Sequence, residues 1–333
     1  MQSKRFGTAW LDEWLGNREQ PESNFLVIEV FWRCGGTSAR GELVAQALRA
    51  GQVAADVVAR LEFGRWEEDL DELSFGRVIE AMVAGGYLGT AIAILDHRLG
   101  KRPDELDARR KLVLELVLSG ELIRCHGMIE FHWERLAERL VERHATEIAG
   151  AILAEQADRS RGMWFLEFSG ATNVLRRCAE VVPSGVWQLI AARLSDPSEA
   201  PFFCVGVPPG LVDLVEQNEV LAWVSEDPAK RGAVIARLLQ KDFSDDRSTQ
   251  SRILGAYADL REVAGSFLGE YMSGGWSGPA SAHWRQLAAA LSEVAGNTKL
   301  PKLRAWATQG ARTLEEMAMS DEELEAEEHR FRA

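Results

Sequence analysis

The residues best suited to chemistry lie in the stretch GEYMSGGWSGPASAHW, residues 269–284, where a serine and a histidine stand among glycines and tryptophans. Ser277 and His283 are the residue types of a nucleophile and its base. A hydrolase elbow needs G-x-S-x-G at a turn from a strand to a helix, whereas Pro279 stands in place of the last glycine and the stretch follows a helical pattern. The sequence therefore argues against a catalytic pair of Ser277 and His283.

The same stretch has the features of a connection between two helices. The glycines at 274–275 suit the end of a helix, where a left-handed backbone is common, and Pro279 suits the first turn of the next helix. We interpret the stretch as a structural turn and expect Trp276 to wedge between neighbouring helix hairpins.

A second candidate for chemistry is CHGMIEFHWERLAERLVERHATE, residues 125–147, which is rich in histidine and glutamate. Its possible ligands are three histidines and four glutamates at successive i, i+4 spacing: His126, His132, His144, Glu130, Glu134, Glu138 and Glu142. Carboxylate-rich metal sites draw ligands from several helices, whereas these glutamates line one helix. The sequence favours a helix without metal, and a metalloenzyme with iron, manganese or zinc at His126, His132 or Glu130 is the third alternative for this chain.

On that helix the glutamates are expected to form a solvated face, with i, i+3 pairs between Arg135 and Glu138 and between Arg139 and Glu142. The opposite side should pack in the core and consists of Trp133, Leu136, Leu140, His144 and Ile148. His144 is then a packed histidine with one satisfied nitrogen.

Motifs for phosphate and zinc chemistry are absent from the sequence. The chain has no G-x-x-x-x-G-K-[ST], no G-x-G-x-x-G after a strand pattern and no H-E-x-x-H. We therefore predict no enzymatic activity, no cofactor and no metal.

The four cysteines, Cys34, Cys125, Cys178 and Cys204, are widely spaced and form no C-x-x-C pair. This pattern indicates reduced and mostly buried thiols, not a disulfide framework or a zinc knuckle.

The charge balance bears on the class of partner. The chain has 38 lysine and arginine residues against 51 aspartate and glutamate residues, a formal net charge of −13. Nucleic acids are bound mainly through neutralisation of their phosphates, so direct binding of nucleic acid is disfavoured. The two basic clusters that could oppose this are Arg109, Arg110 and Lys111, and Arg176 with Arg177. A protein partner with a basic surface fits the charge better.

Hydrophobic patterning places the chain outside the membrane. Apolar runs such as LVLELVL at 112–118 are much shorter than the roughly 20 residues of a membrane span, and no secretory signal opens the chain. We expect a soluble, cytoplasmic protein.

Helical patterns dominate the chain. In DPAKRGAVIARLLQKD, residues 227–242, Asp227 can cap a helix, Pro228 fits its first turn, and the apolar residues recur at helical spacing. Residues 103–120 show the same helical features: a proline and acids at the start, leucines and valines at helical spacing, and a glycine at the end. The run NFLVIEVFW at 24–32 is rich in β-branched residues, but no partner strand is visible, so a helix is favoured there too.

Short links between the helices favour an all-α, irregular HEAT-like α-solenoid of stacked hairpins over a globular bundle. A strict 34-residue repeat is missing, which argues against a tetratricopeptide array. The proline-rich segment SDPSEAPFFCVGVPPG is the strongest internal break. The predicted organisation is a helical block at 1–195, a linker at 196–210, a HEAT-like block at 211–319 and an acidic tail at 320–333, which should be a frayed or solvent-exposed helix.

From EVLAWVSEDPAKRGAVIARLL through the GGWSGP turn to LPKLRAWATQGARTLEEM, residues 219–333 resemble the C-terminal HEAT-like regions of large bacterial proteins, many linked to anti-phage defence. The resemblance implies a region that recognises a partner or trigger while a separate nuclease, NTPase or NAD-consuming module acts. No signature of such a module accompanies it in this chain.

The function predicted from these observations is a non-catalytic recognition or scaffolding subunit, in a bacterial anti-phage defence complex. The alternative is an accessory or regulatory domain of an enzyme whose nuclease or NTPase module lies on another chain. Its 11 tryptophans could fill the core or anchor a partner. The candidates for structural or interaction anchors are Trp223, Trp276, Trp284 and Trp306.

Overall fold

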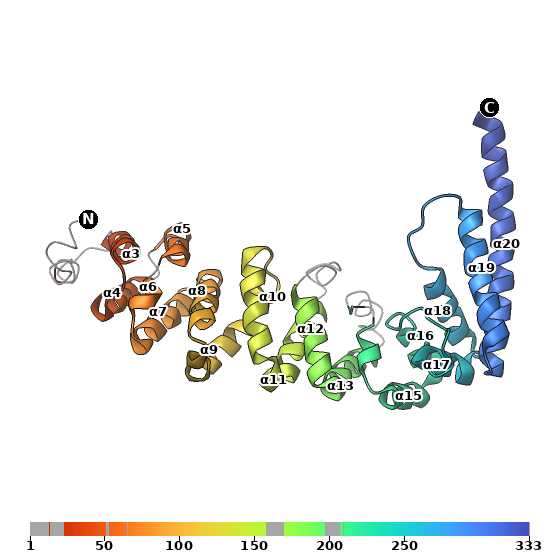
Figure 1. Ribbon diagram of the computed structural model, residues 1–333, viewed down its shortest axis with the longest axis horizontal. Coiled ribbons are helices and arrows are strands. Elements are labelled where there is room, and N and C mark those ends of the chain that lie inside the picture. Colours follow the sequence, from red (N-terminus) through yellow and green to blue (C-terminus); the bar gives the residue numbers. More distant parts are fainter. Residues whose placement is uncertain are drawn as a thin grey trace. The chain divides into compact units, whose positions relative to one another are not determined.

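A computed structural model of the protein describes residue 13 and residues 23–50, 53–64, 66–157, 170–196, 207–208 and 210–332. These residues form seventeen α-helices and three short 3-10 helices, and they contain no strand (Figure 1). The prediction of an all-α fold is therefore confirmed. The ambiguous run at 24–32 lies within a helix, α3 (Ser23–Cys34).

The chain divides into two compact units, each with its own internal packing. The first comprises residues 1–155 and 168–177, and the second comprises residues 156–167 and 178–333. This division falls before the proline-rich segment at 196–210, of which residues 197–206 and 209 lie outside the described residues.

The first unit contains a succession of short helices and one long one. They are α3, α4 (Ser38–Arg49), α5 (Ala55–Ala59), η1 (Arg60–Phe63), α6 (Trp66–Asp69), α7 (Glu72–Ala84), α8 (Leu88–Lys101), η2 (Pro103–Glu105), α9 (Leu106–Val117), α10 (Gly120–Ile123), α11 (Met128–Ala157) and the first residues of α12 (Gly170–Val181). Thr37 caps α4 by accepting from the Arg40 amide, and Asp71 caps α7 by accepting from the Ser74 amide at 2.8 Å. The segment predicted as a helix at 103–120 begins with the 3-10 turn η2 before α9 starts.

Four aromatic side chains, Phe31, Trp66, Phe75 and Trp133, lie among the aliphatic residues in the described core of the first unit. Trp66 is fully buried, and its ring lies 4.8 Å from the ring of Phe31 and 6.0 Å from that of Phe75. The indole N–H of Trp66 donates to the Leu61 carbonyl at 2.9 Å, and that of Trp133 donates to the Val117 carbonyl at 3.0 Å. Each buried indole thus has a hydrogen-bond partner, as burial of a polar group requires.

The second unit contains α13 (Pro183–Leu194), η4 (Val212–Leu214), α15 (Gln217–Glu226), α16 (Pro228–Ile235), α17 (Thr249–Tyr257), α18 (Arg261–Met272), α19 (Ala280–Asn297) and α20 (Pro301–Arg332). As the sequence predicts, Asp227 caps α16, with its carboxylate accepting from the Lys230 amide, and Pro228 occupies the first turn. The helix is shorter than the expected 227–242, because it ends at Ile235.

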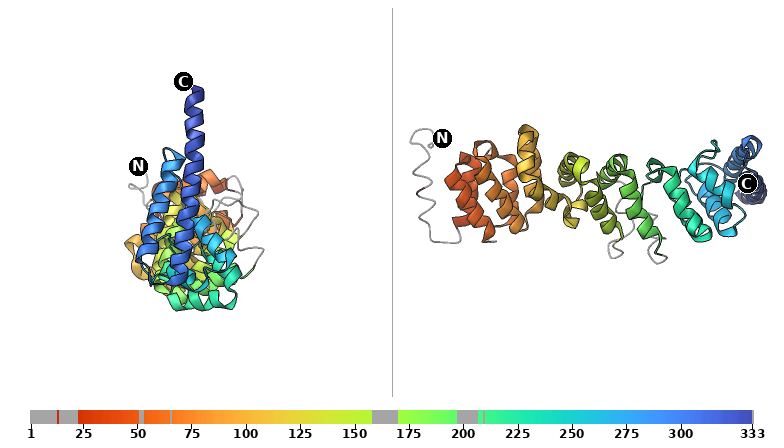
Figure 2. Two further views of the ribbon diagram at one scale, coloured as in Figure 1. Left: turned by 90° about the vertical axis from the view of Figure 1, so that its right-hand side faces the viewer. Right: turned by 90° about the horizontal axis from the view of Figure 1, so that it is seen from below.

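The last two helices form an antiparallel hairpin that positions the candidate site. α19 and α20 pack along each other, and α20 is the longer of the two (Figure 1). Among the described helices of this unit, none lies beside the last turns of α20, which project past the start of α19 (Figures 1 and 2).

Within the described ranges, no helix combines the length and the apolar character that crossing a bilayer requires.

Candidate functional site

Among the described residues of the second unit, the most exposed aromatic side chain lies where α18 connects to α19. Every residue from Ser273 to Pro279 is exposed, and the Trp276 side chain retains 46% of its accessible surface. One face of its indole stacks on the imidazole of His283, with ring centroids 4.7 Å apart and planes 6° apart. Trp284 completes the group, with its ring 5.2 Å from that of Trp276. We call Trp276, His283 and Trp284 the aromatic corner.

Backbone geometry in the connection presents Trp276 to solvent. Gly278 has a φ of +99°, a left-handed conformation that favours glycine, and Pro279 follows as the cap of α19. No other group lies within 4 Å of a Cβ built at Gly274, Gly275 or Gly278, so the loop carries no packing of its own at these positions.

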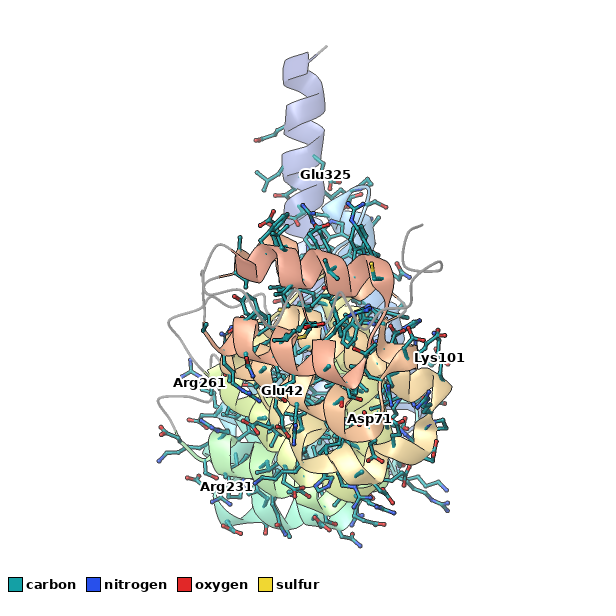
Figure 3. The ribbon with its side chains drawn as sticks, turned by 90° about the vertical axis from the view of Figure 1, so that its left-hand side faces the viewer. Glu42, Asp71, Lys101, Arg231, Arg261 and Glu325 are labelled. Atoms are coloured by element: carbon teal, nitrogen blue, oxygen red, sulfur yellow. The ribbon has the colours of Figure 1, made fainter. Side chains whose placement is uncertain are left out.

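Acidic residues of α20 hold the start of α19 in place. The Trp284 indole N–H donates to Asp321 Oδ2 at 2.8 Å, and the Ser281 hydroxyl donates to Glu325 Oε2 at 2.7 Å. Glu325 lies on α20 below its projecting end (Figure 3). Hydrogen bonds from Ser281 lower the pKa of the Glu325 carboxyl. The tail is helical over residues 320–332 and largely exposed over its described side chains, as expected, but Asp321 and Glu325 also dock on α19, which the sequence did not predict.

A third contact between the two helices joins Arg285 to Glu322. This ion pair raises the pKa of the Arg285 guanidinium. Arg285 directly follows Trp284 in the sequence, and its guanidinium is bound to Glu322.

The predicted tryptophan anchors divide into two groups. Trp223, Trp284 and Trp306 are buried, with 8%, 8% and 6% of their surface exposed, and each indole N–H donates to an oxygen: Ser195 Oγ, Asp321 Oδ2 and the Ala264 carbonyl. They are structural residues. Trp276 alone of the four is exposed, so the expectation that it wedges between hairpins is wrong; the glycine-rich loop carries it outward.

Ser277 and His283 are not joined as a nucleophile and its base in the structure. No hydrogen bond joins them within the described part of the chain, and the imidazole lies flat on Trp276 with its Nε2 atom buried and unpaired there. A nucleophile needs its base within hydrogen-bond reach, so the stretch serves as a connection that carries an aromatic surface.

Three of the possible ligands on α11, His132, Glu130 and Glu134, contact other helices. The Glu130 carboxylate accepts from the Gly170 amide, and Glu134 accepts from the Asn173 side chain at 2.8 Å. His126 is exposed, and His132 lies 3.0 Å from Asp96. The described residues contain no group of three or more histidine, cysteine or acidic side chains that could hold a metal ion.

Asp96 on α8 contacts three side chains of α11 and is a residue that the sequence interpretation missed. Its carboxylate is 1% exposed and is approached by His132 at 3.0 Å, Arg135 at 3.3 Å and Arg139 at 3.8 Å. Arg135 and Arg139 thus pair with Asp96 on α8, not with Glu138 and Glu142 on their own helix as expected. The signal for Asp96 was a single acid inside the apolar run TAIAILDHRL.

The other side of α11 agrees better with the sequence. Trp133, Leu136, Leu140 and Ile148 are buried as expected. His144 lies at a break in the helix, where its φ of −132° is not helical, and its Nδ1 is 3.3 Å from Glu147. One nitrogen of His144 is therefore satisfied, as predicted, while Nε2 has no partner among the described residues.

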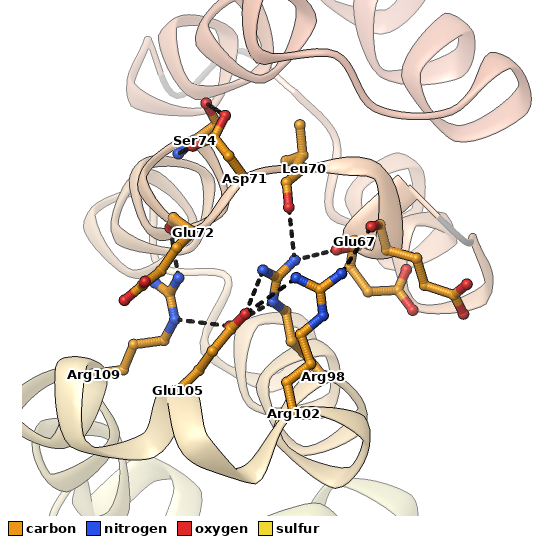
Figure 4. A network of polar contacts seen from close by, with 10 residues as sticks. Glu67, Leu70, Asp71, Glu72, Ser74, Arg98, Arg102, Glu105 and Arg109 are labelled. Carbon is orange, nitrogen blue, oxygen red and sulfur yellow. Dashed lines mark hydrogen bonds and ion pairs between the residues drawn. The ribbon is translucent and has the colours of Figure 1, made fainter.

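A buried polar network joins Arg98 of α8 to Glu105 of η2 and to backbone carbonyls at the end of α6 (Figure 4). Arg98 is 2% exposed and makes a two-fold contact with Glu105, with both nitrogen–oxygen distances at 2.7 Å. Its remaining nitrogen donates to the Glu67 and Leu70 carbonyls, which ends α6. The Arg98 guanidinium lowers the pKa of the Glu105 carboxyl. The contacts of Arg98 are all made to groups of the chain itself, so we assign this network a role in stabilising the first unit.

Most residues of the two basic clusters are buried or paired with acids of the first unit. Arg109 is buried, its guanidinium lies 4.8 Å above the Phe75 ring, and burial lowers its pKa. A Cβ at Gly76 would meet Arg109 Nη1 at 2.7 Å, so a larger residue there would require the Arg109 guanidinium to shift. Arg110 pairs with Asp107, and Arg177 pairs with Glu142 at 3.0 Å. Lys111 and Arg176 are exposed.

Three of the four cysteines lie in the described part, and all three are free thiols there. Cys178 is buried, Cys125 is half-buried with a pKa raised by burial, and Cys34 is exposed. The expectation of mostly buried thiols is therefore wrong for Cys34, which ends α3 at the surface. Cys204 lies outside the described residues.

Two of the clefts in the second unit are lined by described residues. One, of about 400 Å³, is lined mainly by small apolar residues of α18 and α20 beside Trp306. The other, of about 660 Å³, lies between the 241–247 loop and the end of α19. Two acids that line this cleft form hydrogen bonds within the protein. Asp246 accepts from Thr298 Oγ1 and from the Lys299 amide, and these bonds lower the pKa of the Asp246 carboxyl. Asp242 accepts from the Ser244 amide.

In comparisons with known proteins, no family model matches the chain, and no match is found among curated proteins or among solved structures. The function has to be inferred from the chain's own side chains.

Proposed function

We propose that this protein is a non-catalytic recognition or scaffolding subunit, built as an irregular HEAT-like α-solenoid, which holds a protein partner at the aromatic corner. The observation that carries the proposal is the exposure of Trp276 beside two tethered aromatic rings. Tryptophan is among the residue types that dominate binding energy at protein interfaces.

The packing of the helices supports the solenoid part of the proposal. In the first unit α3 packs on α4, α4 on α7, α7 on α8 and α8 on α9. In the second, α15 packs on α16, α16 on α18, and α17 and α19 on α20. Contacts restricted to helices near in sequence are typical of repeat architectures, in which each unit touches only its neighbours.

Rigidity of the aromatic corner supports the recognition part. Trp284 is fixed by Asp321, and the stacked His283 supports one face of Trp276 from α19. An anchor that is already held in its bound orientation loses little conformational entropy when a partner docks. An exposed tryptophan that packs against rings of a neighbouring helix therefore suits binding better than one without such contacts.

The resemblance of residues 219–333 to HEAT-like regions of defence-associated proteins extends the proposal to a bacterial anti-phage complex. In the alternative function, the partner is the nuclease or NTPase chain itself. Both versions use the same site, and the identity of the partner separates them.

Site-specific photo-crosslinking in cells tests the proposal. A photoreactive benzophenone amino acid replaces Ser277, beside Trp276, and the control carries it at Gln286, an exposed position of α19. We expect one protein to crosslink from position 277 and not from 286. That protein, once purified, should bind the wild-type chain about 30-fold more tightly than Trp276→Ala, the range of an interface hot spot. No specific crosslink from 277, or equal binding of the purified partner to Trp276→Ala, would overturn the proposal.

A further inference from the structure

We infer that the partner presents an arginine side chain to the aromatic corner, with the guanidinium lying on the free face of Trp276 and further basic residues following α20. This inference rests on the proposed function and names the chemistry of the partner. It is carried by the geometry of the corner and by the charge of the neighbouring helix.

Trp276 offers one flat surface to a ligand. His283 covers one face of the indole, because the two rings are parallel within 6° and 4.7 Å apart. Nearly half of the side chain remains exposed. The electron-rich face of an indole attracts cations, and tryptophan is the strongest of the aromatic residues in this respect.

The chain itself pairs arginine with aromatic rings repeatedly. Arg231 lies 4.9 Å above Trp223, Arg33 lies 5.2 Å from Trp32, and Arg135 lies 5.4 Å from Phe131. Among the described residues, no cation lies over Trp276. Arg285, the arginine nearest in sequence, is held by Glu322. The cation for this ring would therefore come from a partner.

The charge of α20 selects a basic partner. Between residues 315 and 327 it carries seven acids: Glu315, Glu316, Asp321, Glu322, Glu323, Glu325 and Glu327. Asp321 joins this acidic segment directly to the aromatic corner through Trp284. Glu323 and Glu327 are exposed and have neither a hydrogen bond nor an ion pair with the described residues. Their charges are free to attract a basic chain, whereas an acidic one would be repelled.

Arginine fits the site better than lysine does. The guanidinium is planar, so it can stack on the indole while its N–H groups reach carboxylates at the edge. The lysine ammonium is a strongly hydrated point charge that gains less from a flat aromatic surface. A lysine segment should therefore bind, but more weakly.

Defined peptides test the inference on the full-length chain. Four peptides share a glycine–serine framework and carry three arginines, three lysines, three citrullines or three glutamates; citrulline keeps the planar shape and removes the charge. Binding is followed through the indole N–H signals in two-dimensional NMR, with Trp276→Ala identifying the Trp276 signal. We expect the arginine peptide to shift that signal and to bind about 3-fold more tightly than the lysine peptide and at least about 10-fold more tightly than the citrulline peptide.

Variants give a second readout for the same inference. Trp276→Ala should weaken the arginine peptide about 5-fold or more, within the range of an exposed to partly desolvated cation–π contact. Glu323→Gln with Glu327→Gln should weaken it about 2- to 3-fold at low salt, with the effect fading towards 0.5 M salt as the charges are screened. Phe63→Ala, which removes an exposed ring in the first unit, is the matched control and should change nothing.

Three results would overturn the inference: equal binding of the citrulline or glutamate peptide, equal binding of the arginine peptide to Trp276→Ala, or self-association of the chain through Trp276 in sedimentation. The failure of the two proposals can be told apart. A partner that crosslinks from position 277 through an acidic or neutral segment refutes the arginine and leaves the recognition function standing. Binding of the arginine peptide without a cellular crosslink from position 277 refutes the recognition function and leaves the affinity of the aromatic corner for arginine standing.

Discussion

At the scale of single residues, the polar contacts of greatest consequence are buried ones in the first unit. Arg98 and Glu105 are both buried and satisfy each other through two hydrogen bonds, and Arg98 also ends α6 through backbone carbonyls (Figure 4). Breaking a buried ion pair leaves a charge without a partner, which is far more destabilising than losing an exposed pair.

Glu105→Gln should therefore lower the free energy of unfolding of the first unit by roughly 3 kcal/mol. The matched control is Glu42→Gln, which breaks the exposed pair with Arg77 and should change it by less than about 1 kcal/mol. Hydrogen exchange of peptides from α8 and α9 measures both values. Similar values for the two variants would show that the network does not stabilise the unit.

The pKa of Glu105 predicts how this contribution depends on pH. Arg98 lowers the Glu105 pKa in the folded chain, so the unfolded chain binds the proton more readily. The stabilisation is fully present above the unfolded value of about 4.3 and is lost as the pH falls through the lower folded value. The difference in stability between wild type and Glu105→Gln should thus shrink below about pH 4. A difference that grows with acidification would contradict the assignment.

Two neighbouring tryptophans should differ sharply when truncated. Trp284 is buried and its indole N–H is bonded to Asp321, so Trp284→Ala should destabilise the second unit by roughly 3 to 5 kcal/mol. Trp276 is exposed, so Trp276→Ala should change stability by less than about 1 kcal/mol. Thermal unfolding by calorimetry compares them. An equal loss for both would place Trp276 in the core after all.

At the scale of elements, the hairpin of α19 and α20 decides where the aromatic corner stands. Asp321, Glu322 and Glu325 each contact α19, so the acidic tail is docked over its first part. The sequence predicts a helical tail but gives no sign of this docking, because acids at helical spacing look the same whether they face solvent or the serine and indole of a neighbouring helix.

Deletion of residues 320–333 should therefore lower the melting temperature of the second unit by several degrees, as a loss of about 1 to 2 kcal/mol would in a unit of this size. Glu323→Gln and Glu327→Gln are the controls, since both side chains are exposed and form no hydrogen bond or ion pair with the described residues, and each should shift the melting temperature by less than about 1 °C. A deletion as harmless as the control substitutions would mean that the docking contacts add no stability.

The sequence predicts the helices well and the contacts between them poorly, for a physical reason. The Asp227 cap, the Pro228 first turn and the buried side of α11 follow from local patterns that a helix must satisfy. The partners of Arg135 and Arg139 do not, because a long side chain can reach either an acid on its own helix or Asp96 on another. The exposure of Trp276 depends on the path of the glycine-rich loop, and such a path leaves no periodic signal.

At the scale of the whole molecule, a strongly acidic chain carries an exposed tryptophan, Trp276, in the connection between α18 and α19. Under the proposed function, the net charge of −13 would set how fast a basic partner arrives, and the contact at the aromatic anchor would set how long it stays. The central claim is that Trp276 is that anchor.

The dissociation rate of the crosslinked partner from immobilised chain tests this claim most directly. For Trp276→Ala the rate should rise roughly 30-fold over wild type, with little change in the association rate, and for Phe63→Ala it should stay unchanged. A dissociation rate for Trp276→Ala within about 2-fold of wild type would contradict the account, because a hot-spot anchor cannot be removed without shortening the lifetime of the complex.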